Sequence, residues 1–326
     1  REEGAMGKKP NILVVGSFVM DLIVSTQRLP ENGETVLGTG FRTAPGGKGL
    51  NQAVQAARLG AQVEMMGCVG RDAYGDTMLA CAREAGVDVS HVKHTDQAPS
   101  AIGNVQLFQR SDGSTQNRIV VVPGANLLLT QADVAFLREK IGGFDMVMLQ
   151  LEIPLPVNIA VARYARAAGV PVMLNPAPAA PLPADLLSAV TYLSPNENEA
   201  ELLSGVPLHR TEHGIDLKRV EHAAAVLRDK GAAHVIVTLG DVGSAYLGKE
   251  FLHCPSVSGI QAIDPTAAGD SYIGALSVAL AGGEPVDEAM RRATHTAAIT
   301  VSRMGALPSL PTLAEVEVSL ARRSVS

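Results

Sequence analysis

Short apolar runs rich in β-branched residues alternate along this chain with segments of helical periodicity. The runs span residues 12–16, 63–68, 146–150, 172–175, 191–194 and 235–239. The helical segments span residues 51–59, 73–85, 130–141, 156–168 and 217–230. Strands that are apolar on both faces are typical of a parallel sheet covered by helices on either side. The alternation therefore predicts a doubly wound α/β fold with a mostly parallel sheet.

Two stretches do not follow this alternation, at about residues 22–45 and 101–122. The second contains a turn at Ser111–Gly113. Both alternate apolar and polar residues, as strands with one solvated face do. They predict a small antiparallel sheet that projects from the main domain, either as a lid over the active site or as a dimer contact. We expect a single α/β domain over residues 10–322, and residues 1–9 to form a tail, native or added.

Composition excludes several classes of function. In 326 residues there is no apolar run of the roughly 18 residues that a membrane span needs, and no signal segment opens the chain. The net charge is −6 without a Lys/Arg cluster, which argues against nucleic acid as a partner. Three scattered cysteines without a Cys-x-x-Cys pair are expected to be reduced thiols. We therefore expect a soluble, cytoplasmic protein.

The run DPTAAGD, Asp264 to Asp270, follows an expected strand at 257–263 and precedes an apolar helix. Ala267, Ala268 and Gly269 leave backbone N–H groups uncovered, and a helix N-terminus attracts anions, so a phosphoryl group could bind there. Asp270 beside that anion could accept the proton of an attacking hydroxyl. The competing interpretation is that Asp270 caps the helix and the alanines pack.

A second turn, PGGKGLN from Pro45 to Asn51, leads into an amphipathic helix. It is not a Walker A loop, because Arg42 takes the place of the first glycine and Gly49 the place of the Ser or Thr that binds magnesium. The glycines instead allow a polyol to approach, with Lys48 and Asn51 donating to its hydroxyls. The alternative is an ordinary turn with Lys48 in solvent.

Together these two turns resemble the two signatures of the PfkB carbohydrate kinase family, and within it the ribokinase branch. The likeness spans nearly all of residues 11–315. The first signature is Gly46-Gly47-Lys48-Gly49-Leu50-Asn51-Gln52-Ala53, followed by Gly60 and Gly70, and the second is DPTAAGD itself. Four further segments match in order: residues 150–152, 175–179, 195–199 and 238–240.

The resemblance implies a sugar site and a catalytic base. The residues expected to contact the sugar are Asp21, Gly46, Gly47, Lys48, Asn51 and Glu152, with Asp270 as the base facing its terminal hydroxyl. Asp21 and Glu152 also lie just beyond expected strands, at the edge where open α/β sheets bind ligands. Each carboxylate can accept two hydroxyl donors.

The resemblance also implies a site for ATP with Mg²⁺. Asn196 would lie at the phosphates, and Glu199 would bind Mg²⁺ through water, although without the family these residues suggest a helix cap and a solvated acidic turn. Thr238, Gly240 and Gly243 would form the nucleotide loop. His295 could border the adenine, but a lone histidine is more often structural. An activating K⁺ would bind at Asp264, Thr266, Thr300, Arg303, Gly305 and Ser309.

The favoured reaction is phosphorylation of the 5-hydroxyl of D-ribose by ATP. Val19 stands where ribokinases usually have Asn, and Ile273 takes another position that is often Asn, so 2-deoxy-D-ribose is the alternative substrate. A nucleoside kinase and a non-catalytic sugar- or nucleotide-binding protein are weaker alternatives, the latter because the anion hole and Asp270 are intact. The expected partners are the sugar, ATP and a second copy of the chain, joined through the lid.

Overall fold

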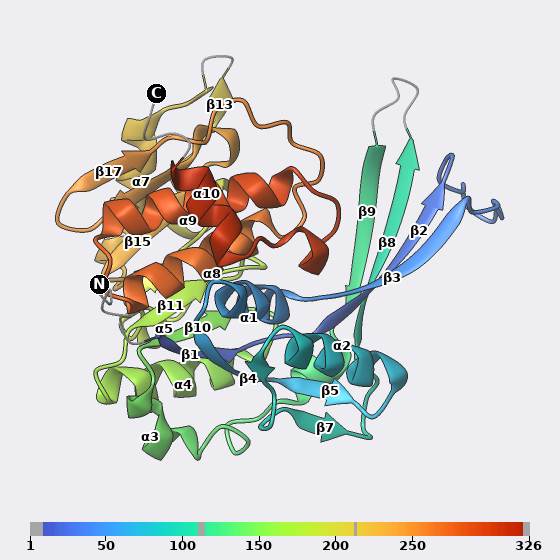
Figure 1. The fold of residues 1–326 in the computed structure, drawn as a ribbon, viewed down its shortest axis with the longest axis horizontal. Helices are drawn as coiled ribbons and strands as arrows, with labels where there is room; N and C mark the ends of the chain where they lie inside the picture. Colours follow the sequence, from blue (N-terminus) through green and yellow to red (C-terminus); the bar gives the residue numbers. More distant parts are fainter. Residues whose placement is uncertain (1–8, 110–114, 212–213, 322–326) are drawn as a thin grey trace, which may run out of the picture.

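A mostly parallel sheet runs through the molecule, with helices on both faces, in the computed structural model (Figure 1). The structure describes residues 9–109, 115–211 and 214–321. Within these ranges the sheet has nine strands in the spatial order β17-β16-β15-β12-β11-β10-β1-β4-β6, and β16 and β17 are antiparallel to their neighbours. The strands are β1 Asn11–Val15, β4 Gln62–Met66, β6 Val87–Asp88, β10 Met146–Gln150, β11 Val172–Asn175, β12 Tyr192–Leu193, β15 His234–Thr238, β16 Ser244–Leu247 and β17 Phe251–Cys254. The predicted fold class is confirmed.

The two faces of strand β1 build two separate cores. Ile12 and Val14 pack into one apolar cluster, and Leu13 and Val15 pack into the other. The first cluster is covered by α1 Lys48–Arg58, α2 Ala73–Glu84, α8 Ala268–Ala281, α9 Val286–Val301 and α10 Leu313–Ala321. The second is covered by α3 Leu137–Lys140, α4 Leu155–Ala167, α5 Ala184–Leu187, α6 Glu197–Ser204 and α7 Leu217–Asp229. None of the helices in the described ranges has both the length and the apolar character that a membrane span requires.

The strand order reverses between β1 and its neighbour β10. From β1 the chain first adds β4 and β6 on one side, and then β10, β11, β12 and β15 on the other. In open α/β sheets, ligands bind at the carboxyl ends of the strands beside such a reversal. The residues after Val15 and after Gln150 are therefore placed to form a site.

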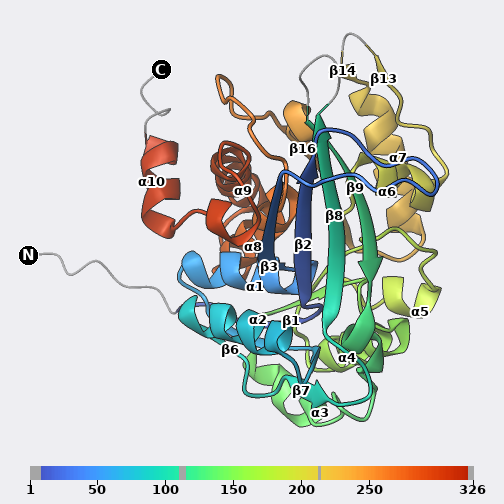
Figure 2. The ribbon, with the colours of Figure 1, turned by 90° about the vertical axis from the view of Figure 1, so that its right-hand side faces the viewer.

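A second sheet stands beside the main domain, where the lid was expected (Figures 1 and 2). It contains β2 Val19–Thr26, β3 Gly40–Gly46, β8 Ala101–Gln109 and β9 Thr115–Val122, in the order β3-β2-β8-β9. Pairing is antiparallel in β2–β3 and in β8–β9, whereas the central pair β2–β8 is parallel. The expected turn at 111–113 lies outside the described residues. Short two-stranded pairs are formed by β5 Cys68–Gly70 with β7 Lys93–Thr95, and by β13 Arg210–Thr211 with β14 Gly214–Ile215.

The helix predicted over residues 130–141 is mostly wrong, since only Leu137–Lys140 is α-helical. Thr130 and Asp133 bond reciprocally, as in a helix cap. However, the Asp133 carboxylate also accepts the Lys93 ammonium at 2.8 Å, which ties it to β7. The following residues form consecutive turns whose hydrogen bonds span three residues, such as Leu137 N to Val134 O.

The strand predicted at residues 257–263 is also wrong. The segment is an irregular loop that bends at Gly259, where φ is +70°. Its apolar residues Val257 and Ile260 line a cavity instead of pairing in a sheet. Apolar content alone does not distinguish a buried strand from a loop that covers a ligand site.

Candidate active site

The glycine-rich turn packs against the end of β1, where two backbone segments nearly touch. A Cβ at Gly49 would lie 2.4 Å from the Ser17 nitrogen, and Gly47 has φ +97°, so both positions favour glycine. Glu152, just after β10, holds the turn from the other side. Its Oε2 accepts from the Lys48 backbone N–H at 3.0 Å and from the Ser17 hydroxyl. The turn is therefore fixed at the reversal point of the sheet.

Asp270 lies in the first turn of α8, and its two carboxylate oxygens are held by α1. Oδ2 accepts from Asn51 Nδ2 at 2.9 Å, and Oδ1 accepts from Gln52 Nε2 at 3.0 Å. The Asp270 residue is only 8% exposed. It does not cap the helix, because the N-cap position is Ala267 and no side chain caps it. The two sequence motifs therefore meet through these hydrogen bonds.

The N-terminus of α8 offers the geometry of an anion site. Ala267 adopts the left-handed conformation, with φ +59°, and its carbonyl accepts the Ser271 N–H at 2.8 Å. The N–H groups of Gly269 and Asp270 precede that bond and have no acceptor within the helix. A Cβ at Gly269 would meet nothing within 4 Å. Open space at a helix start with exposed amides suits a phosphoryl group.

Asp21 extends from β2 into the region between the turn and the lid. A Cβ at Gly103 on β8 would lie 2.2 Å from Asp21 Oδ1, and one at Gly46 would lie 3.4 Å from Asp21 Oδ2. Burial, together with the nearby charge of Glu152, raises the pKa of Asp21 to about 6. Both causes disfavour the charged form of the carboxyl group, and a ligand that donates hydrogen bonds to it would favour that form.

The side-chain oxygen of Asn51 is a buried acceptor to which no described residue donates a hydrogen bond. The Nδ2 of Asn51 is bonded to Asp270, while its Oδ1 is buried and has no hydrogen-bond partner within the described part of the chain. This oxygen lies 3.8 Å from where a Cβ at Gly46 would be, on the same side as Asp21 Oδ2. A carboxylate and an unpaired amide oxygen around one glycine are suited to a ligand that supplies hydroxyl donors.

Lys48 and Glu199 connect this region to α6. Burial alone would lower the pKa of Lys48, but the negative charges of Asp270, Glu152 and Glu199 outweigh it, and the pKa is raised. Burial raises the pKa of Glu199, whose Oε2 accepts from the Asn196 N–H at 2.8 Å in a capping box. The Lys48 ammonium therefore stays protonated among three acids that come from different elements.

A cavity of about 530 Å³ opens beside the N-terminus of α8. The predicted residues Thr238, Gly240 and Gly243 line it, as do Ala268 and Gly269. Other residues that line the cavity were not predicted from the sequence: those of the loop at 256–262, and Tyr272, Thr294, Ala297, Ala298 and Val301. The volume is in the usual range of small-molecule sites, roughly 300–1,000 Å³.

His295 lies on α9 one residue after the lining residue Thr294. Its Nδ1 pairs with Ser319 Oγ at 2.8 Å, so the ring contacts α10. The structure does not give this histidine a place among the residues that line the cavity. Its proposed contact with adenine remains a prediction.

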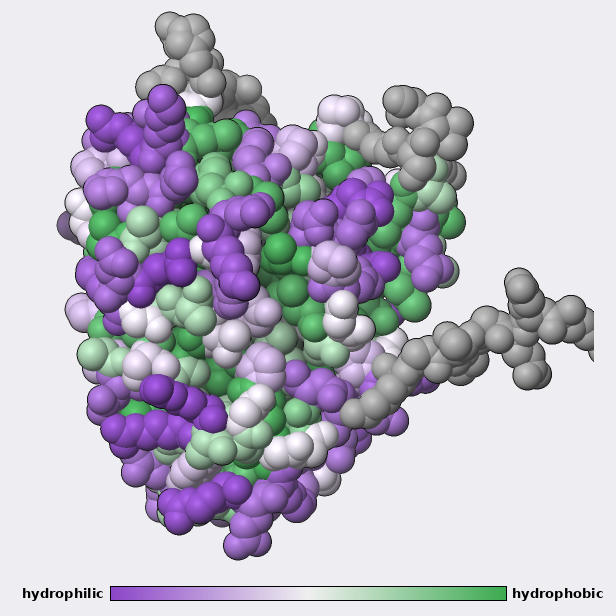
Figure 3. All heavy atoms as spheres, turned by 90° about the vertical axis from the view of Figure 1, so that its left-hand side faces the viewer, coloured by the Kyte–Doolittle hydropathy of each residue, from purple (hydrophilic) through white to green (hydrophobic). Residues whose placement is uncertain are grey.

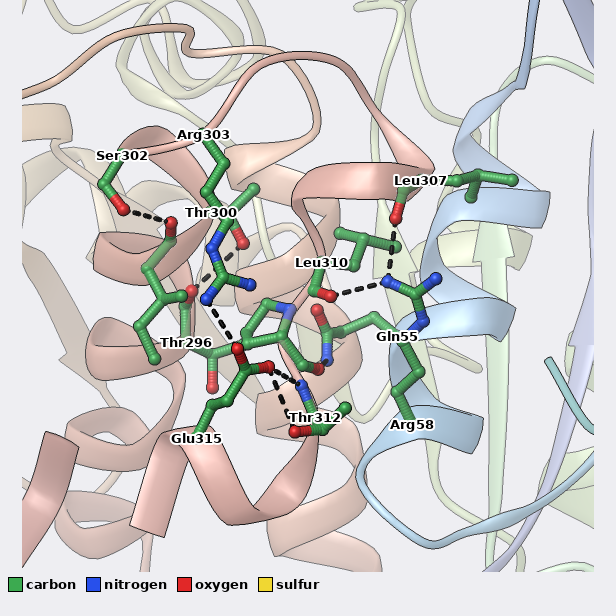
Figure 4. Close-up of polar contacts among 12 residues, drawn as sticks. Gln55, Arg58, Thr296, Thr300, Ser302, Arg303, Leu307, Leu310, Thr312 and Glu315 are labelled. Carbon is green, nitrogen blue, oxygen red and sulfur yellow. Dashed lines mark hydrogen bonds and ion pairs between the residues drawn. The ribbon is translucent and has the colours of Figure 1, made fainter. Parts of the chain in front are cut away.

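Two of the residues expected to bind K⁺, Thr300 and Arg303, lie at or just after the end of α9 (Figure 4). Asp264 Oδ1 accepts from the N–H and hydroxyl of Thr266, and its Oδ2 accepts from the Gly305 N–H at 2.8 Å. These bonds hold the pKa of Asp264 below its usual value despite partial burial, which opposes the shift. The side chains of Thr300, Arg303 and Ser309 bond to Thr296 O, Glu315 and Ala306 O. Arg303 has no side-chain acceptor, so its contact with an ion would use its backbone oxygen.

A family model described as pfkB family carbohydrate kinase matches residues 9–313. The chain belongs to the pfkB carbohydrate kinase family. As a member, it is an ATP-dependent sugar kinase.

Relatives in this family are similar over nearly their whole length. Ribokinase of Schizosaccharomyces pombe is 39% identical over 319 residues, covering 95% of this chain and 97% of its own. Deoxyribokinase of Salmonella typhi is 31% identical and covers 93% and 96%. Among solved structures, Arabidopsis thaliana ribokinase complexed with ribose and ATP superposes with a TM-score of 0.86 at 34% identity, covering 96% and 99%. Thermotoga maritima ribokinase gives a TM-score of 0.84 at 33% identity, covering 96% and 99%.

Proposed function

We propose that this kinase transfers the γ-phosphate of ATP to the 5-hydroxyl of D-ribose. The observation that carries the proposal is the position of Asp270. Its neighbours Ala268 and Gly269 line the cavity proposed for the nucleotide. Its partner Asn51 has a buried oxygen without a hydrogen-bond partner among the described residues, 3.8 Å from where a Cβ at Gly46 would be. The carboxylate therefore lies between the two substrates. The likeness to ribokinases, one of them complexed with ribose and ATP, supports ribose as the acceptor.

In the proposed mechanism the sugar binds beneath the lid sheet, with Asp21 and Asn51 accepting hydrogen bonds from its hydroxyls. Asp270 takes the proton from the 5-hydroxyl as that oxygen attacks the γ-phosphorus in line. The N–H groups at the start of α8 and the Lys48 ammonium stabilise the charge on the transferred group. The lid excludes water that would otherwise hydrolyse ATP.

Mg²⁺ would neutralise charge between the β- and γ-phosphates. Glu199 and Asn196 fit this role through their oxygens, which are the donors that Mg²⁺ prefers. In the ranges the structure describes, no group of three or more His, Cys, Asp or Glu side chains is arranged to hold a metal. The ion would therefore be held chiefly by phosphates and water, with Glu199 acting through a water molecule.

A panel of D-ribose, 2-deoxy-D-ribose, D-fructose and adenosine with Mg-ATP tests the substrate. We expect the highest kcat/KM with D-ribose. The second candidate, 2-deoxy-D-ribose, is favoured by Val19, whose Cγ1 lies 3.7 Å from where a Cβ at Gly103 would be, beside Asp21. An apolar group there cannot bond a sugar hydroxyl. A higher kcat/KM with 2-deoxy-D-ribose would replace ribose by this candidate.

Asp21→Asn is expected to stabilise the protein and weaken sugar binding. Because the folded-state pKa is about 6, above the ~3.9 of an unfolded aspartate, the folded protein binds the proton more tightly. Stability is therefore lost as the pH rises from about 4 to about 6. At pH 7.5 the free energy of unfolding should be roughly 1–2 kcal/mol higher in the variant. Denaturant unfolding at pH 5 and 7.5 measures this, and the difference should shrink at pH 5.

The sugar affinity of Asp21→Asn is measured on the same samples by calorimetry. The Kd for the sugar should rise by roughly tenfold or more, because a charged acceptor is lost. An unchanged Kd would remove Asp21 from the sugar site, whatever its effect on stability.

K⁺ is expected to raise kcat several-fold over the value in Tris buffer without alkali cations. A cation bound by Asp264, Thr266 and Gly305 would fix the loop that leads into α8 without touching the sugar. The measurement is the initial rate with K⁺, Na⁺ or neither, at constant ionic strength. The same rate in all three would count against a K⁺ site.

The lid sheet is proposed to join two copies of the chain. On its edge strand β9, the consecutive residues Ile119, Val120, Val121 and Val122 are 48–66% exposed. Apolar side chains are therefore exposed on both faces of β9. On the opposite side of the molecule, polar and apolar residues are intermingled (Figure 3). Exposed apolar edges are typical contact surfaces. Sedimentation should give about twice the 34.0 kDa mass of one chain, and a monomer at micromolar concentration would contradict this.

A further inference from the structure

Gln52 and Asn51 bind the same carboxylate but differ in the polar atoms they have left. Gln52 is fully buried, and its Nε2 donates to Asp270 Oδ1 at 3.0 Å and to Asn175 Oδ1 at 3.3 Å. Its Oε1 accepts from Gln150 Nε2 at 2.6 Å. The nitrogen and oxygen of Gln52 are thus both engaged by protein groups, whereas Asn51 keeps an unpaired oxygen. Gln52 can therefore influence the reaction only through Asp270.

The neighbours of Gln52 determine which way its amide faces. Because Gln150 donates to Oε1, the nitrogen must point toward the Asp270 carboxylate. A reversed amide would place an oxygen against that carboxylate and a nitrogen against the Gln150 nitrogen. Asn175 is itself oriented, since its Nδ2 donates to Ser194 O at 3.1 Å. Asp270, Asn175 and Gln150 thus bond both ends of the Gln52 amide, while Gln150 Oε1 itself has no partner among the described residues.

The backbone of the central sheet anchors these amides. Gln150 is the last residue of β10 and Asn175 the last residue of β11, which are adjacent parallel strands paired at these residues. At the end of β1, a Cβ at Gly16 would lie 2.1 Å from Gln150 Oε1, so a larger residue would displace the amide. Gln150 and Asn175, which contact Gln52, are therefore held at the ends of two paired strands.

Helices α1 and α8 also approach closely enough for this contact. A Cβ at Gly274, one turn after Asp270, would lie 2.9 Å from the Gln55 Cβ and 3.1 Å from the Gln52 carbonyl oxygen. The glycine lets the helix that carries Asp270 lie directly against the helix that carries Gln52. The positions of the Gln52 donor and the Asp270 acceptor are thus both fixed by the packing of α1 against α8.

We propose that Gln52 is a positioning residue for the catalytic base, and that Gln150 and Asn175 act through it by fixing its amide. This inference rests on the proposed role of Asp270. Gln52 holds Oδ1 while Asn51 holds Oδ2, so the two amides together fix the plane of the carboxylate that would accept the proton. Small displacements of a catalytic group can cost on the order of 10²-fold in rate.

Gln52→Met tests the proposal, with Gln55→Met as the matched control. Gln55 lies on the same helix and is equally buried, but its Nε2 donates to Pro311 O at 3.0 Å, on the side of the segment after α9 (Figure 4). Gln52→Met should lower kcat roughly 10–100-fold, with KM for sugar and ATP within about threefold of the parent values. Gln55→Met should keep kcat within about twofold. Both variants are compared with the parent by thermal unfolding.

Gln150→Met gives a second test that leaves both bonds of Asp270 intact, and it serves alone if Gln52→Met does not fold. It should lower kcat without raising KM, and the double variant should match Gln52→Met within about twofold, because Gln150 acts through Gln52. Parental kcat in Gln52→Met or in Gln150→Met, or an equal loss in Gln55→Met, would overturn the inference. Activity retained by Asp270→Asn would instead refute the proposed base itself.

Discussion

Asp270→Asn is expected to lower kcat by ~10²–10⁴-fold and to leave the affinity for sugar within about threefold. The amide cannot accept the proton of the attacking hydroxyl, although it has nearly the shape of the carboxylate. In the proposed site, ground-state binding of the sugar would use Asp21 and Asn51, whose oxygens do not take part in this step. Steady-state kinetics gives kcat, and calorimetry with the sugar alone gives Kd.

Thermal unfolding of Asp270→Asn is the necessary control. The carboxylate accepts one hydrogen bond on each oxygen, from Asn51 and from Gln52, and asparagine offers one acceptor oxygen. The variant can therefore lose some stability while remaining folded at the assay temperature. A folded variant with kcat near that of the parent would exclude Asp270 as the base.

Gly269→Ala is expected to reduce kcat/KM for ATP by roughly 10²-fold while making the protein slightly more stable. The added methyl meets no atom within 4 Å in the protein, and Gly269 is not among the glycines with positive φ. The folded chain therefore tolerates it, and the unfolded chain loses flexibility. The methyl would instead occupy space needed by the transferred phosphoryl group beside the α8 amides.

Gly143→Ala is the matched control for this substitution. Gly143 also has an ordinary φ and open space at its Cβ, but it lies before β10, at the edge of the sheet opposite the site. Its activity should equal that of the parent. If Gly269→Ala were equally active, the phosphate would have to bind elsewhere than at the start of α8.

The sequence was sufficient to predict the framework of the fold. Residues 146–149, for example, are all apolar, and β10 has the predicted bounds Met146–Gln150. The meeting of the two glycine-containing turns was implied by the family resemblance and not by the strands before them, because the first turn follows the lid strand β3 and the strand predicted before the second is a loop. The hydrogen bond from Asn51 to Asp270 joins the two turns.

Other features depend on contacts between distant segments and could not be predicted. The loop at 256–262 is as apolar as a strand, and only the cavity beside it shows why it does not pair. Gln52 was part of a recognised motif, yet its bonds to Gln150 and Asn175 come from strands about 100 residues away or more. The parallel pairing of β2 with β8 likewise joins two hairpins that are far apart in sequence.

The most direct test is a single incubation of the protein with Mg-ATP and D-ribose, followed by ³¹P NMR. The account predicts a phosphomonoester at the 5-position that grows in step with ADP, and no such signal with Asp270→Asn. Release of ADP and inorganic phosphate without a sugar phosphate, or the same product formed at the parental rate by Asp270→Asn, would contradict it.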